Sequence, residues 1–173
     1  DTEVKESRDR VRAALQNCGF EMPARRITAN LAPADLPKES GRFDLPIALG
    51  ILAASGQLPA EQLHEYEFAG ELSLSGQLRP IRGALAMTFA MQRGKNGAPR
   101  AFILPHANAD EAALVPNASI YPAHSLLEVC APFAARDQRN ALQRHQPALL
   151  SPQFSYPDFA EVQGQHHARR ALE

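Results

Sequence analysis

The sequence contains few cysteines and no long apolar run. Its two cysteines, Cys18 and Cys130, are far apart and lie in apolar, helix-like contexts. That pattern favours reduced core thiols over a disulfide framework or a metal site, and it indicates a cytoplasmic protein. The longest apolar stretch, residues 45 to 54, is too short to span a bilayer, and the charged opening DTEVKESRDR does not fit a signal peptide. We therefore expect a soluble protein with no membrane partner.

An excess of one charge and a nucleotide-binding loop are also missing. The 18 basic and 19 acidic residues leave a net charge of −1, so any surface for nucleic acid must be local. No GxxxxGK[ST] pattern occurs, so this chain should not bind ATP through a phosphate-binding loop. Adjacent His166 and His167 point in different directions on a helix and cannot easily share one ion. Because His106, His124 and His145 are scattered among loop-like residues, we expect neither a metal nor a cofactor here.

Apolar residues at helical spacing predict five helices, and residues 165 to 173 look like the opening of a further helix. The stretch 44 to 55 is apolar on all sides, which is typical of a central helix, with Asp44 as its N-cap and Pro46 in its first turn. Asn108 and Glu111 stand at the spacing of a capping box. The other expected helices cover residues 1 to 17, 84 to 93, 108 to 115 and 125 to 130.

Strand signals alternate with these helices. The sequence RITANL, residues 26 to 31, alternates Ile27, Ala29 and Leu31 and predicts a half-buried strand. Residues 68 to 74 and 78 to 81 flank the turn dipeptide Ser75-Gly76 and predict a hairpin. Short strands are expected at 101 to 104 and 119 to 121. Together these elements predict an α/β (α+β) class with a mixed sheet packed against helices.

The composition changes after residue 131. Residues 132 to 157 are rich in Arg, Gln, Pro and Ser without a sustained apolar period, which indicates a linker between a domain at 1 to 131 and a further segment at 158 to 173.

Several ordered motifs now support a family resemblance. PARRITANLAPADLPKESGRFDLPIALGILAASG, FAGELSLSGQLRPIRGAL and AFILPHANADEAALV closely resemble the N-terminal domain of the ComM/YifB family of magnesium-chelatase-like AAA+ ATPases. DFAEVQGQHHARRALE resembles the start of that family's ATPase module. The resemblance implies a ribosomal protein S5 domain 2-like fold, similar to the proteolytic domain of Lon, with opening strands ahead of residue 1. It also implies a hexameric parent that uses ATP and Mg²⁺ as a DNA branch-migration helicase in natural transformation.

The loop PKESGRFDLPIALG raises the question of whether Asp44 is catalytic or a cap. In the Lon-like pattern, Asp44 falls where a serine nucleophile would stand, and Leu85 falls at or beside the position of its lysine base. The three lysines are Lys5, Lys38 and Lys95, and none lies in the right place; the nearby Arg79 and Arg82 stay protonated and cannot act as the base. We interpret Asp44 as a helix cap and the catalytic position as vacant.

Positive charge is the remaining candidate chemistry. Lys5, Arg8 and Arg12 share one helical face, whereas Arg10 leaves it and is spaced to pair with Glu6. One interpretation is a patch that binds DNA phosphates, without base stacking because aromatic residues are not interleaved. Another is the solvated surface of a scaffold domain, which shapes the ring together with neighbouring subunits and the domain's own ATPase module. A divergent serine peptidase is a third. The nucleic-acid candidates are Lys5, Arg8, Arg12, Arg25, Arg26, Arg79 and Arg82, with Lys38 and Arg42 at nearby element ends.

The vacant dyad predicts that the chain does not cleave proteins. We expect no turnover of unfolded casein and no labelling by serine-directed phosphonates. Asp44→Ser alone should not create activity, because the base would still be missing. Reproducible cleavage that is lost when a single serine is changed would contradict this prediction.

Overall fold

The computed structural model describes residues 2 to 31, 41 to 93, 100 to 134, 142 to 146 and 164 to 172. The five expected helices and the helix opening expected at 165 to 173 are confirmed to within four residues at their ends. The helix expected at 125 to 130 ends at Ala134, past the predicted domain boundary at 131. The helices are α1 (Thr2–Asn17), α2 (Asp44–Ala54), α3 (Ala84–Gln92), α4 (Ala109–Ala113), α5 (Leu126–Ala134) and α6 (His166–Leu172), with short 3₁₀ turns at Gly41–Phe43, Leu63–Glu65 and His106–Asn108. None of these described helices has the length and apolar character that crossing a membrane requires.

The described strands form two separate sheets. Strands β1 (Tyr66–Phe68), β4 (Ala101–Pro105) and β5 (Ile120–Ala123) make a parallel sheet in the order β1-β4-β5. Strands β2 (Glu71–Leu72) and β3 (Leu78–Arg79) make the predicted antiparallel hairpin. The α/β class is confirmed, but the expectation of one mixed sheet is wrong.

The sheets are separate because the chain turns between β1 and β2. The Ala69 backbone N–H still donates to the Ile103 carbonyl of β4, but the next one, at Gly70, donates to the Arg42 carbonyl ahead of α2. The Gly70 carbonyl in turn accepts from the Leu45 N–H. The predicted strand over 68 to 74 is therefore split, and its second half is held at the start of α2.

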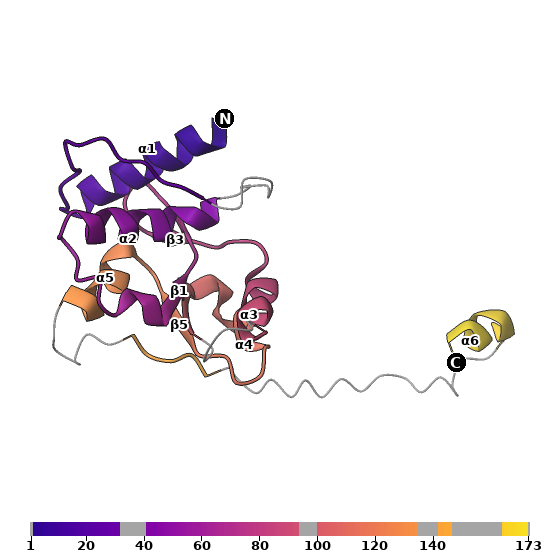
Figure 1. Cartoon of the computed structure of the whole chain (residues 1–173). Helices are drawn as coiled ribbons and strands as arrows, with labels where there is room; N and C mark the ends of the chain where they lie inside the picture. The colour runs from indigo at the N-terminus through magenta and orange to yellow at the C-terminus, as the bar shows by residue number, and fades with distance from the viewer. Residues whose placement is uncertain (1, 32–40, 94–99, 135–141, 147–163, 173) are drawn as a thin grey trace.

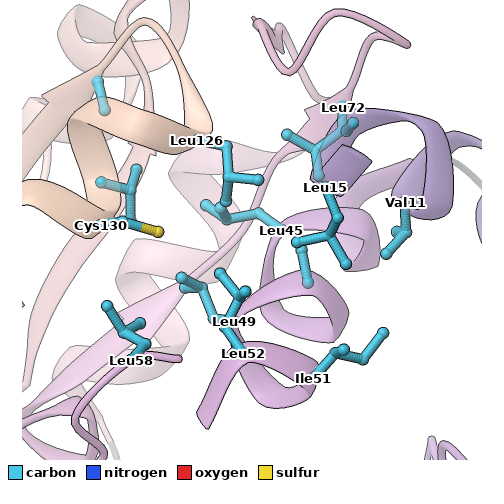
Figure 2. Close-up of a cluster of buried hydrophobic side chains, with 14 of the residues drawn as sticks. Val11, Leu15, Leu45, Leu49, Ile51, Leu52, Leu58, Leu72, Leu126 and Cys130 are labelled. Atoms are coloured by element: carbon cyan, nitrogen blue, oxygen red, sulfur yellow. The ribbon is translucent and has the colours of Figure 1, made fainter. Parts of the chain in front are cut away.

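The parallel sheet has helices on both faces (Figure 1). Alternation along β4 assigns its side chains to two cores, because successive residues of a strand point to opposite faces. Ile103 packs in the core under α1, α2 and α5, whereas Phe102 and Leu104 pack in the core under α3 and α4. Figure 2 shows the larger core, where Val11 and Leu15 of α1 meet Leu45, Leu49 and Leu52 of α2. The long apolar helix thus lies centrally, as predicted.

Both cysteines are free thiols, as expected. Burial raises the pKa of Cys130 to about 12, and the neighbouring Cys18 thiol adds to the shift. Cys18 is half-buried against the hairpin turn, where a side chain at Gly76 would collide with its sulfur. Gly76 also has a φ of +81°, so glycine is required at this turn for two reasons.

Two local expectations, a strand at 26 to 31 and a capping box at Asn108 and Glu111, fail. Residues 26 to 31 belong to no ladder in the described chain, and Ile27 is 40% exposed. Asn108 precedes α4 but makes no capping hydrogen bond; its side-chain amide instead bonds both the N–H and the carbonyl of Ile81. Glu111 accepts from the Leu85 N–H rather than closing a capping box.

Part of the predicted linker packs against the domain. The His145 N–H donates to the Ile120 carbonyl of β5, and the His145 ring lies 2.8 Å from the Asp110 carboxylate. Leu142 packs against the larger core. Residues 142 to 146 therefore lie beside β5, while the rest of 135 to 163 falls outside the described residues.

Leu52 provides a test of the central position of α2. Its side chain is fully buried, so Leu52→Ala should lower the free energy of unfolding by roughly 2 to 5 kcal/mol through lost burial and the cavity left behind. Leu127→Ala is the matched control, since Leu127 is 51% exposed and its loss should change stability by less than about 0.5 kcal/mol. Urea unfolding followed by circular dichroism measures both, and equal effects would contradict the assignment.

Candidate functional site

Asp44 is not a cap but the acceptor of a buried network. Its carboxylate is fully buried and accepts from Ser7 Oγ at 2.6 Å and Arg10 Nε at 2.7 Å. The Leu72 N–H of β2 donates to the same group at 3.2 Å. Phe43, not Asp44, holds the N-cap position of α2, and no side-chain capping bond forms there. The cap interpretation is therefore wrong.

The network follows from the geometry of α1. Ser7 and Arg10 are three residues apart, so they lie on the same face of the helix as the buried Val11 and Ala14. The hydrogen bond to Asp44 raises the pKa of the Arg10 guanidinium above its ordinary value, against the opposing effect of partial burial. The expected pairing of Arg10 with Glu6 exists, but at 3.8 Å it is the longer contact. Arg10 thus holds α1 against the start of α2.

The second dyad position has different surroundings. Leu85 is 41% exposed near the start of α3, and α3 packs on the opposite face of the sheet from α2. Asp44 meets α1 and β2, whereas the Leu85 backbone meets Glu111 of α4. The structure does not bring the two positions into a common contact. Lys38 and Lys95 lie outside the described residues.

Four of the basic candidates border one groove. Lys5, Arg8 and Arg12 of α1 and Arg25 of the following segment line a cavity of about 1310 Å³. Arg10, Glu6, Glu21 and Glu71 also line it, so five basic side chains face three acidic ones. Arg8 pairs with its exposed neighbour Asp9 at 3.2 Å. The lining therefore carries more basic than acidic side chains, although the chain as a whole is slightly acidic. We call the four exposed candidates Lys5, Arg8, Arg12 and Arg25 the basic rim of the groove.

The other three basic candidates lie outside this groove. Arg26 is exposed beside Arg25. Arg79 of β3 lies 3.6 Å from the carboxylate of Glu71, which itself borders the groove. Arg82 is exposed just before α3. The structure thus gathers part of the predicted set and leaves the rest on neighbouring surfaces.

The described histidines form one stacked pair and no group of three. The rings of His106 and His124 stack with centroids 4.4 Å apart, beyond the carboxyl ends of β4 and β5, and both residues are exposed. His166 and His167 are exposed on α6. Within the described ranges, no three His, Cys, Asp or Glu side chains stand close enough to hold a metal ion.

The chain is thus an α/β domain that buries the carboxylate of Asp44 and exposes Lys5, Arg8 and Arg12 of α1 beside an open groove. Comparison with known proteins identifies the family of the chain. The sequence model of the family described as subunit ChlI of Mg-chelatase matches residues 1–108. The chain belongs to this magnesium-chelatase-like family, together with ComM and YifB.

The relatives are similar along the whole chain. The competence protein ComM of Haemophilus influenzae is 48% identical over 98% of this chain, and YifB of Escherichia coli is 46% identical over 100% of it. An uncharacterized protein of Mycobacterium tuberculosis is 38% identical over the same span. The chain covers 33% of the length of each of these relatives.

The Arg10–Asp44 pair gives a stability prediction. Arg10→Met leaves a fully buried carboxylate without its cationic partner, and removing one member of a buried pair costs roughly 3 to 5 kcal/mol. Arg12→Met removes an exposed arginine from the same helix and should change stability by less than about 0.5 kcal/mol. Urea denaturation at pH 7 measures both variants. A loss below about 1 kcal/mol for Arg10→Met would mean that the network does not hold α1 in place.

Proposed function

We propose that this chain is the non-proteolytic, Lon-like accessory domain of a magnesium-chelatase-family AAA+ ATPase, and that its basic groove rim contacts DNA phosphates. The ribosomal protein S5 domain 2-like fold is part of this proposal. The parent would be a homohexamer that uses ATP and Mg²⁺ for branch migration during natural transformation. The relative named as a competence protein and the Mg-chelatase family match support this reading.

The observation that carries the proposal is that the basic side chains of α1 point in two directions. Arg10 turns inward to Asp44, whereas Lys5, Arg8 and Arg12 stay exposed and border the same groove as Arg25. Basic side chains along one surface bind the nucleic acid backbone by releasing counterions, without reading its sequence. The rim has acidic neighbours, so we expect weak binding by the isolated domain and stronger binding when a ring presents several copies.

The state of Asp44 supports a role other than proteolysis. Its carboxylate is fully buried and is engaged by Ser7, Arg10 and the Leu72 N–H, so no substrate can reach it without unfolding this contact. Leu85 supplies no base. A peptidase would therefore need a different nucleophile from the one that the Lon-like pattern implies.

A scaffold role is the second candidate, and an exposed apolar surface favours it. Leu85 and Phe89 lie one helical turn apart on α3 and are 41% and 49% exposed, and Leu114 just after the neighbouring α4 is 70% exposed. Exposed large apolar side chains on neighbouring helices are a feature of many protein contacts. A subunit neighbour or the ATPase module would cover this surface if the domain's role is to set the geometry of the ring.

DNA titration tests the main proposal. We expect weak, sequence-independent binding, with a dissociation constant of roughly 10⁻⁴ to 10⁻⁶ M at physiological salt. If about four basic residues contact phosphates, log affinity should fall with log salt at a slope of about −3 to −4. Arg8→Ala/Arg12→Ala should flatten that slope by about two units. Fluorescence anisotropy of labelled duplex and single-stranded DNA at several salt concentrations provides the measurement.

Arg100→Ala is the matched control for the titration. Arg100 is 55% exposed, pairs with Glu67 of β1 and does not line the groove. This variant should bind DNA with the slope of the parent chain. Absence of binding at low salt, or binding that the α1 substitutions leave unchanged, would favour the scaffold role instead.

A further inference from the structure

Helix α3 is apolar on almost every side. Its sequence, ALAMTFAMQ, contains no charged residue. Ala84 and Thr88 are buried, and Met87 and Met91 pack against the core under α3 and α4. A helix that is apolar all round is normally surrounded by protein. The side of α3 that faces away from this core therefore has the composition of a contact surface.

Four exposed residues, Leu85, Ala86, Phe89 and Ala90, form this outer face of α3. Residues four apart are neighbours on a helix surface, so Leu85 and Phe89 make a ridge, and Ala86 and Ala90 make a shallow furrow beside it. Helices α3 and α4 lie across the parallel sheet from α1 and α2 (Figure 1). The outer face of α3 is therefore separate from the basic groove.

The ridge and the furrow are complementary to each other. When two helices pack through rows of residues four apart, the ridge of each helix lies in a groove of the other. A second copy of α3, related to the first by a two-fold axis, would set its Leu85 and Phe89 over Ala86 and Ala90 of the first. The symmetry makes the same contact twice. Large side chains over small ones also let the two helices approach closely.

A second copy matches the outer face of α3 better than other described surfaces of the chain do. A head-to-tail contact would need a different apolar surface to receive α3. The groove beside α1 is lined by five basic and three acidic side chains, which suits it less well to an uncharged helix. The remaining large apolar side chains that are strongly exposed among the described residues lie in separate segments: Ile27, Leu74, Leu114 and Leu127.

Charges at the two ends of α3 favour an antiparallel arrangement. At the C-terminal end, the Arg93 guanidinium lies over the Phe89 ring, 4.5 Å from its centroid. At the N-terminal end, the Glu111 carboxylate accepts from the Leu85 N–H at 3.0 Å. An antiparallel pair would place Arg93 of each copy near Glu111 of the other, whose oxygens can accept further hydrogen bonds. Arg82 also precedes the N-terminal end, so apolar contact must supply most of the attraction.

We infer that this chain forms a two-fold dimer, in which α3 of one copy packs antiparallel on α3 of the other through Leu85 and Phe89. A single helix face buries less area than a standard interface, so the dimer should be weak, with a dissociation constant in the micromolar range or above. Neighbours in a ring meet head to tail, so in the proposed hexamer a two-fold contact would join one ring to another. This inference goes beyond the proposed function and does not depend on DNA binding.

Sedimentation velocity at increasing protein concentration tests the inference. The chain of residues 1 to 173 should pass from monomer to dimer and form no larger species, because a two-fold contact closes on itself. Phe89→Gln removes an aromatic side chain from the centre of the contact and should raise the dimer dissociation constant at least about tenfold. Leu85→Gln should act in the same direction. Circular dichroism establishes that both variants fold.

Leu127→Gln is the matched control for these variants. Leu127 is 51% exposed on α5, away from α3, so its substitution should leave the dissociation constant unchanged.

A single introduced cysteine tests the symmetry of the contact. Ala86→Cys lies near the expected two-fold axis, so a short bis-maleimide should join it to the same residue of a second copy, both in the 1 to 173 chain and in the full-length protein. Leu127→Cys reports random collisions and should stay monomeric. Cys18 and Cys130 should add little background, since burial raises the pKa of both thiols.

Three results would overturn the inference. The first is a chain that stays monomeric at every concentration, or a dimer that Phe89→Gln and Leu85→Gln leave unchanged. The second is a series of larger species without a crosslink at position 86, which would assign the outer face of α3 to a head-to-tail contact. The third is a crosslink that forms in the 1 to 173 chain but not in the full-length protein, which would assign this face to the ATPase module.

Discussion

The contact of Arg10 with Asp44 is the constraint on which the N-terminal half of the domain depends. It joins α1 to the start of α2, and the Leu72 N–H adds the hairpin to the same carboxylate. A buried carboxylate is costly unless its oxygens are satisfied, so the three elements must meet in one arrangement. The contact also sets the rotation of α1. Because Arg10 points inward, Lys5, Arg8 and Arg12 point toward solvent and the groove.

Elements with strong local signals could be predicted from the sequence. The apolar run of α2, the Ser75-Gly76 turn and the short apolar strand β4 are each specified by residues that lie close together in the chain. Their type and approximate ends were therefore confirmed. The two parallel strand pairs were harder to anticipate, because β1, β4 and β5 are far apart in sequence and their register depends on the helices between them.

Two of the errors share one physical cause, which is a distant partner. Asp44 has the sequence of a cap, but residues 34 and 37 positions earlier in the chain supply better donors. Asn108 likewise satisfies the backbone of Ile81 rather than its own helix. Of the candidate site, the exposed face of α1 was predictable from spacing alone. The groove beside it was not, because Ile47 and Ile51 reach it from α2, a separate helix.

The short contact of residues 142 to 146 covers part of the outer edge of β5. His145 donates to the Ile120 carbonyl, and Arg144 donates to the Ala118 carbonyl just before the strand. An outermost strand without such a cover presents a row of free N–H and C=O groups to any similar strand in solution. A chain that stopped after α5 would leave β5 in that state. Copies could then join edge to edge, and the sheet would grow from one molecule into the next.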